Sequence, residues 1–202
     1  MRSAFLILLL GMAILGGCAT PPPPAPDPDR AADLHAARLP ALQALTDWSI
    51  KGRIGLSSEV ESWHADLRWR QSEEHYLINL AGPFGQGRVK IEGRPGLVTL
   101  ETEDRVFRDL DADRLINRRL GWQVPVRGLN WWVRGMASPR MADPLSREFD
   151  ERGRLLRLSQ GGWIVEFLRY RDVDGLQLPD KVFAENPEWK VRIVIADYKV
   201  GS

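Results

Sequence analysis

Residues 48–56 read Trp-Ser-Ile-Lys-Gly-Arg-Ile-Gly-Leu, so that apolar residues alternate with polar or small ones. Successive side chains of a β-strand point to opposite faces, and Trp48, Ile50, Ile54 and Leu56 would therefore share one face. The residues between them would face water. This alternation predicts a strand of an antiparallel sheet that is apolar on one side only.

The same two-residue period returns through most of the chain. It is clear in residues 63–69, 76–80, 89–91, 163–170 and 189–195. Turns rich in Gly, Pro and charged residues separate the runs. Together with shorter runs between them, these segments predict about eleven strands.

Three segments depart from this period and predict helices. Residues 31–45 have helical spacing, with an interruption expected at Pro40. Residues 109–120 and 125–134 follow the sixth strand, and each segment is followed by a glycine that can end a helix. The chain thus inserts two short helices into a long run of strands.

A long sheet with one apolar face must cover that face. Two short helices are small against about eleven strands, so we expect a mainly β fold, an incomplete antiparallel β-barrel with a small helical lid over an apolar cavity. The tryptophans and tyrosines on the apolar face are compatible with a ligand cavity and with a core that their own side chains fill. The pattern alone leaves both open.

The N-terminus has the pattern of a bacterial lipoprotein signal. Arg2 precedes an apolar run at 4–14, and two glycines precede Cys18, which is the only cysteine. We expect three parts: a signal peptide (1–17), a lipidated Cys18 with a Pro-rich linker (18–30), and one domain (31–202). An ordinary signal peptide with a chance cysteine is the alternative.

Charge and cysteine content exclude several classes of protein. Removal of the signal takes away one of 28 basic residues and leaves 27 against 27 acidic ones. A balanced charge argues against binding to nucleic acid, which requires a basic surplus. A lipidated Cys18 would leave no thiol for a disulfide or a thiolate metal site, so the core alone must hold the fold.

Signals for catalysis are weak, and no catalytic residue, metal site or cofactor is expected. The three histidines lack the spacing of metal ligands, and no nucleophile elbow is present. Ser62 beside His64 is the nearest candidate for a lipid hydrolase, without an evident acid partner.

The segment 81–87, Ala-Gly-Pro-Phe-Gly-Gln-Gly, predicts a loop between two strands. Phe84 at its middle either packs back into the core or stays exposed for contact with something apolar.

In order and spacing, these features resemble the LolB family of outer-membrane lipoproteins. The resemblance covers residues 48–198. It rests on Trp48-x-x-x-Gly52-Arg53, Ala65-x-Leu67-x-Trp69, the loop 82–87, the segment 125–135 and Gln160-x-Gly162-Trp163.

The resemblance implies a monomer on the periplasmic face of the outer membrane that receives lipoproteins from the carrier LolA. Ala19 agrees, because Asp after the lipidated cysteine is an inner-membrane retention signal in some bacteria. Phe84 would help pass the cargo into the membrane. The resemblance further implies that acyl chains bind in the apolar cavity, whose candidate lining residues are Trp48, Ile50, Trp63, Leu67, Trp69, Ile78, Leu129, Trp132, Trp163 and Val165. A passive structural lipoprotein and a lipid hydrolase remain the alternatives.

Overall fold

The computed structural model describes residues 27–201. The expected signal peptide, Cys18 and most of the Pro-rich linker lie outside the described residues. The last linker positions are described and are helical. Helix α1 spans Pro28–Gln43 and so begins three residues earlier than expected. Asp27 begins the helix because its carboxylate accepts the backbone N–H of Asp29 at 3.1 Å, and a proline suits the first helical turn.

The prediction that Pro40 interrupts this helix is wrong. The helix continues to Gln43, within one turn of the proline, and the N–H of Ala44 still donates to the Pro40 carbonyl at 3.0 Å. Leu42 and Leu45 are buried against the core, and this packing outweighs the single hydrogen bond that the proline removes.

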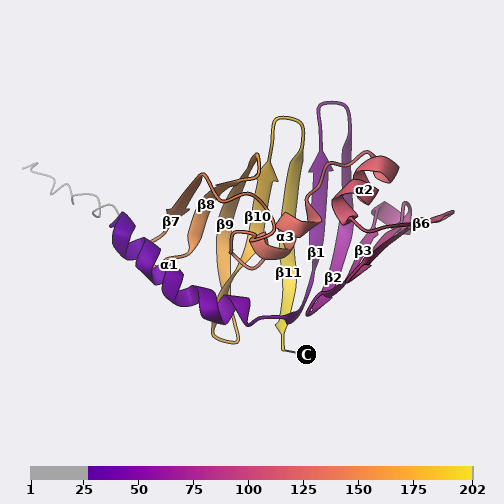
Figure 1. Ribbon diagram of the computed structural model, residues 1–202. Helices are drawn as coiled ribbons and strands as arrows, with labels where there is room; N and C mark the ends of the chain where they lie inside the picture. The colour runs from indigo at the N-terminus through magenta and orange to yellow at the C-terminus, as the bar shows by residue number, and fades with distance from the viewer. Residues whose placement is uncertain (1–26, 202) are drawn as a thin grey trace, which may run out of the picture.

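Eleven antiparallel strands form one sheet in the order β6-β5-β4-β3-β2-β1-β11-β10-β9-β8-β7 (Figure 1). The sheet is curved and does not close, which confirms the expected incomplete barrel. Within the described residues the strands are β1 Asp47–Ser57, β2 Ser62–Ser72, β3 His75–Ala81, β4 Val89–Arg94, β5 Leu97–Glu101, β6 Val106–Asp109, β7 Ser146–Phe149, β8 Leu155–Gln160, β9 Trp163–Val173, β10 Leu176–Glu185 and β11 Lys190–Val200.

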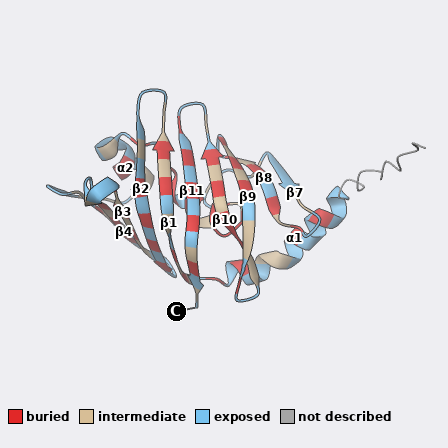
Figure 2. Ribbon diagram, turned by 180° about the vertical axis from the view of Figure 1, so that it is seen from behind, coloured by how far each residue is buried: buried red, intermediate tan, exposed pale blue. Residues whose placement is uncertain are grey.

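Strands β1 and β11 join the two halves of the sheet. Their register shifts between Lys51 and Gly52, at a bulge where Gly52 lies against the Val194 carbonyl. Burial alternates residue by residue along β2, and Figure 2 shows buried and exposed positions alternating on the central strands. The period of two therefore does separate a core face from a solvent face.

The two edge strands, β6 and β7, are consecutive in the sequence but lie at opposite ends of the sheet. The connection between them crosses the concave face and carries α2 (Ala112–Leu120) and α3 (Val126–Trp132), as Figure 1 shows. The segment that the topology sends across the sheet thus also covers its apolar face. We call residues 110–142 the lid.

Both lid helices are shorter than expected. Helix α2 begins after Asp111, whose carboxylate accepts the N–H of Arg114 at 2.9 Å, and it ends at Gly121 with a positive φ of 76°. Asp109 and Leu110 precede the helix. None of the helices in the described part of the chain is long and apolar enough to cross a membrane.

Candidate functional site

The concave face of the sheet and the lid enclose a wholly apolar space. Its volume is about 30 Å³ in this structure, room for no more than a few water molecules. Pockets for small ligands usually have about 300–1,000 Å³. The lid side chains therefore pack against the concave face and leave little free space, and we call this conformation closed.

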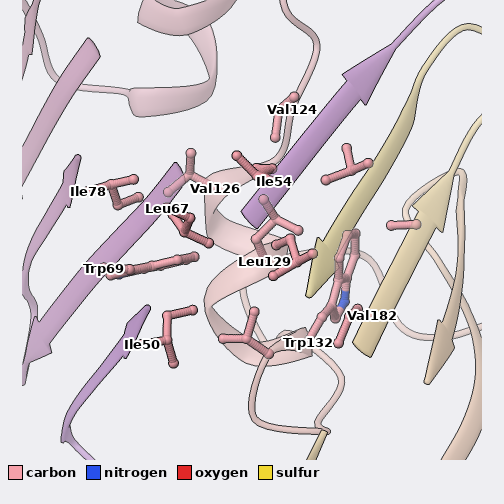
Figure 3. Close-up of a cluster of buried hydrophobic side chains, with 14 of the residues drawn as sticks. Ile50, Ile54, Leu67, Trp69, Ile78, Val124, Val126, Leu129, Trp132 and Val182 are labelled. Carbon is pink, nitrogen blue, oxygen red and sulfur yellow. The ribbon is translucent and has the colours of Figure 1, made fainter. Parts of the chain in front are cut away.

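Four of the ten expected cavity residues line this space. Leu67 and Trp69 from β2 and Ile78 from β3 face Leu129 from α3. Figure 3 shows Val126 and Leu129 of the helix beside Leu67 and Trp69 of the sheet.

Five more expected residues are buried in the same core without lining the space: Trp48, Ile50, Trp132, Trp163 and Val165. The tenth, Trp63, is only half-buried. Its ring lies 4.7 Å from that of Trp122, and its indole nitrogen lies 3.9 Å from the position that a Cβ would take at Gly82 or Gly87. Trp63 thus supports the base of the Phe84 loop.

Nine lining residues were not among the candidates. Five of them follow the two-residue period of their strands and could have been found by it: Ile54, Leu56, Leu80, Ile91 and Ile193. The other four belong to the lid, where no strand period applies: Ile116, Trp122, Val124 and Val126.

A few polar contacts hold the lid to the sheet. Asn130 donates to the side-chain oxygen of Gln71 on β2 at 2.6 Å. Trp132 donates from its indole nitrogen to Gln160 on β8 at 3.3 Å, and Gln160 donates to the Ser138 carbonyl at 2.7 Å. Each such bond adds about 0.5–1.5 kcal/mol net, whereas each large buried lid side chain adds about 1.5–3 kcal/mol. Apolar burial therefore contributes most of the free energy that holds the lid against the sheet.

Arg134 is the buried charge of the lid. Its guanidinium donates to the Leu45 carbonyl at 2.9 Å and to both oxygens of Asn130 at 2.8 and 3.1 Å, and it lies over the Trp131 ring. Burial lowers its pKa to about 10. All three of these hydrogen bonds end on neutral carbonyl oxygens, so within residues 27–201 no carboxylate offsets the cost of burying the charge.

An ion pair joins the two lid helices. Asp113 of α2 accepts from the backbone N–H of Val126 and from the Arg127 side chain, both at 2.9 Å. Burial raises the pKa of Asp113, and the bond from Arg127 opposes this rise. Helices α2 and α3 are thus fastened to each other independently of the sheet.

Phe84 lies at the tip of a closed loop and is fully exposed. The N–H of Gly82 donates to the Gln86 carbonyl at 3.0 Å, and Glu103 accepts the N–H of Gly87 at 3.0 Å. These bonds hold the loop, and Phe84 has a φ of 59°, which is unusual for a residue with a side chain. The loop therefore holds the Phe84 backbone in a conformation that costs about 1–3 kcal/mol, with the side chain in water.

Ser62 and His64 are exposed, and they lie on the face of β2 opposite to Leu67 and Trp69. No hydrogen bond between them is present in residues 27–201, and neither lines the apolar space. In the same residues no group of three or more His, Cys, Asp and Glu side chains is arranged to hold a metal ion.

Fold and site together define an open antiparallel half-barrel with a helical lid over an apolar face. Two solved structures have the same fold. The LolA superfamily protein NE2245 from Nitrosomonas europaea aligns with a TM-score of 0.55 at 9% identity, over 88% of this chain and 95% of its own. A DUF1329 family protein from Desulfovibrio piger also aligns with a TM-score of 0.55, at 8% identity, over 87% and 94%.

Sequence comparison narrows this class to one family. Residues 46–198 match the family described as "Outer membrane lipoprotein LolB". The outer-membrane lipoprotein LolB of Nitrosococcus oceani is 35% identical over 96% of both chains. That of Cellvibrio japonicus is 36% identical over 99% of this chain and 98% of its own. The chain belongs to the LolB family of outer-membrane lipoproteins, which confirms the resemblance and the expected location at the outer membrane.

Proposed function

We propose that the protein receives acylated lipoproteins from the periplasmic carrier LolA, holds their acyl chains beneath the lid, and inserts them into the outer membrane. The observation that carries this proposal is an apolar concave face covered by a separate helical segment with few polar attachments. A face of this kind can exchange its own lid side chains for the apolar chains of a ligand.

The energetics require a shielded path for such cargo. Burying a CH₂ group stabilises it by about 0.8 kcal/mol, so one long acyl chain in water costs roughly 10 kcal/mol. Transfer must therefore run from one apolar surface to another, and it goes forward when the receiving surface binds more tightly. The side chains of Ile116, Val126 and Leu129 border the space now, and we propose that they move outward when cargo enters.

Phe84 is the proposed contact with the membrane, and Cys18 the proposed anchor. The loop around Phe84 presents an apolar side chain at the end of β3, clear of the folded core. Lipidated at Cys18 and spaced by the Pro-rich segment, the domain would act as a monomer on the periplasmic face. We propose no enzymatic step: the transfer breaks no covalent bond.

Depletion of the protein in its own cell tests this function. Lipoproteins should then accumulate on the periplasmic carrier, and restoring the protein should release them to the outer membrane. An unchanged content of lipoproteins in the outer membrane after depletion would refute the proposal.

The small enclosed volume favours a second candidate, a passive structural lipoprotein with a permanently filled core. A fluorescent fatty acid separates the two. If the soluble domain binds the probe and the lid moves, the core can be opened; if the probe does not bind at any concentration below its micelle point, the passive role is favoured.

A further inference from the structure

Three buried polar atoms beneath the lid have no hydrogen-bond partner within the described residues. They are the indole nitrogens of Trp48 and Trp69 and the hydroxyl oxygen of Tyr198. The three side chains are 1%, 2% and 7% exposed. Almost all buried polar groups in folded proteins are paired, because each unpaired one destabilises the fold. Three such groups in one place could be satisfied by a ligand that offers hydrogen-bond acceptors there.

The three groups form one cluster on neighbouring strands. The rings of Trp48 and Trp69 are 5.2 Å apart, and those of Trp48 and Tyr198 are 6.1 Å apart. Ile50 of β1 pairs with Trp69 of β2 on one side and with Tyr198 of β11 on the other. The cluster thus spans the three central strands.

The cluster lies at a border between two kinds of space. Trp69 lines the apolar space beneath the lid. Trp48 lines a pocket of about 280 Å³, which we call the rim pocket; it is also lined by Gln71, Tyr76, Asn130 and Arg134. A ligand that is apolar at one end and polar at the other fits across this border.

The donors at the border select a particular polar group. An indole N–H and a guanidinium donate hydrogen bonds and accept none. In the closed state Arg134 already bonds three neutral carbonyl or amide oxygens, among them the backbone carbonyl of Leu45. An ester carbonyl is the complementary ligand, because it is neutral and only accepts. A carboxylate could also accept from Arg134 and the indoles, but moving its charge out of water costs far more than moving an ester carbonyl.

We propose that Trp48, Trp69 and Arg134 form a subsite for the glyceryl ester carbonyls of an acylated ligand, at the root of the chains that lie under the lid. This inference rests on the proposed function and specifies which polar group of the acylated cargo is recognised. The ligand carbonyls pair the two indole N–H groups and take the place of the Leu45 carbonyl on Arg134. The acyl chains then continue into the apolar space beside Trp69.

The test compares two synthetic ligands by titration calorimetry on residues 27–201, the folded domain that the structure describes. One is a cysteine peptide with an S-diacylglyceryl group and an N-acyl chain, and the other is its analogue with two ether links in place of the esters. We expect the ester ligand to bind the wild type about tenfold more tightly, the effect of one to two hydrogen bonds. Equal affinities would overturn the subsite.

Variants assign the effect to the indoles. Trp48→Phe and Trp69→Phe remove an N–H and keep an aromatic ring, and each should weaken binding of the ester ligand about threefold without changing that of the ether ligand. Trp189→Phe is the matched control, since Trp189 is also buried but lines neither space. An ester preference that survives in both variants would overturn the role of the indoles.

Two further outcomes are informative. One distinguishes failure of the subsite from failure of the proposed function, and the other distinguishes lipoprotein cargo from membrane lipid as the ligand. If neither ligand binds, the proposed function fails as well; if both bind equally, only the subsite fails. A diacyl phosphatidylethanolamine has the same two esters and serves as a competitor. We expect it to compete more weakly than the lipopeptide, and stronger competition would assign the subsite to membrane lipid instead of cargo.

Discussion

The guanidinium of Arg134 in the lid donates a hydrogen bond of 2.9 Å to the backbone carbonyl of Leu45, at the junction between α1 and β1. This bond ties the end of α3 to the start of the central strand. It also connects the lid to the helix that follows the proposed lipid anchor. Breaking it should free the lid without touching the sheet.

We expect Arg134→Met to loosen the lid while the sheet stays folded. A hydrogen bond from a charged group contributes about 1.5–3 kcal/mol, so amide hydrogen exchange in α3 should accelerate by about tenfold or more. The matched control is Arg140→Met, because Arg140 also joins the lid to the sheet, through Glu74, but in an exposed pair of little energetic value. Equal acceleration of exchange in both variants would contradict the proposed role of the Arg134–Leu45 hydrogen bond in holding the lid.

Gly52→Ala should destabilise the protein, since a Cβ at position 52 would meet the Val194 carbonyl and the backbone of Ile195. Overpacking of this kind costs about 1–3 kcal/mol. Gly55 lies on the same strand, and a Cβ at position 55 would have no neighbouring atom within 4 Å, so Gly55→Ala should change the free energy of unfolding by under about 1 kcal/mol. Urea titration measures both, and similar losses would refute the account of the bulge.

Phe84→Gly should reduce the transfer of lipoprotein without lowering the stability of the protein. Glycine adopts the positive φ of position 84 without strain, so the variant should be as stable as the wild type or more stable by about 1 kcal/mol. Without the exposed ring, transfer of lipoprotein into liposomes should fall. Val60→Gly is the control, because Val60 is also exposed, in the β1–β2 turn. Wild-type transfer by Phe84→Gly would remove the proposed role of the side chain.

The ion pair of Asp109 and Arg114 predicts a dependence of stability on pH. The Arg114 side chain lowers the pKa of Asp109 to about 2, from its ordinary 3.8. A depressed pKa in the folded state means that the pair stabilises the fold above pH 3.8 and that this contribution disappears as pH falls towards 2.

Thermal unfolding of Asp109→Asn should therefore show a lower Tm than the wild type at pH 7 and a much smaller difference at pH 2. Glu59→Gln, in an exposed turn, is the control for loss of a carboxylate. A gap in Tm that is the same at both pH values would argue against the ion pair as its cause.

The sheet could be predicted from the sequence because each strand signals its buried face by a local period. The run from Trp48 to Leu56 has the burial that its alternation implies. The continuation of α1 through Pro40 could not be predicted, since contacts of Leu42 with distant residues decide it.

The candidate site was predictable on the sheet and less so on the lid. Leu67, Trp69 and Ile78 follow from the strand period. Trp122 and Val124 lie between two helices in a segment without any period, and only the fold brings them over the concave face. The missing partners of Trp48 and Trp69 have no sequence signal, because a hydrogen bond that is absent depends on three-dimensional packing alone.

Photocrosslinking tests most directly whether acyl chains enter beneath the lid. Benzoylphenylalanine, an aromatic residue of similar bulk, is placed at Trp69, which lines the apolar space, or at Leu168, which is exposed on β9. Each protein is loaded from a carrier with lipoprotein that bears radiolabelled acyl chains, and then irradiated. We predict labelled crosslinks at position 69 and none at position 168. Absence of label at position 69 in a protein that still transfers lipoprotein would contradict the account.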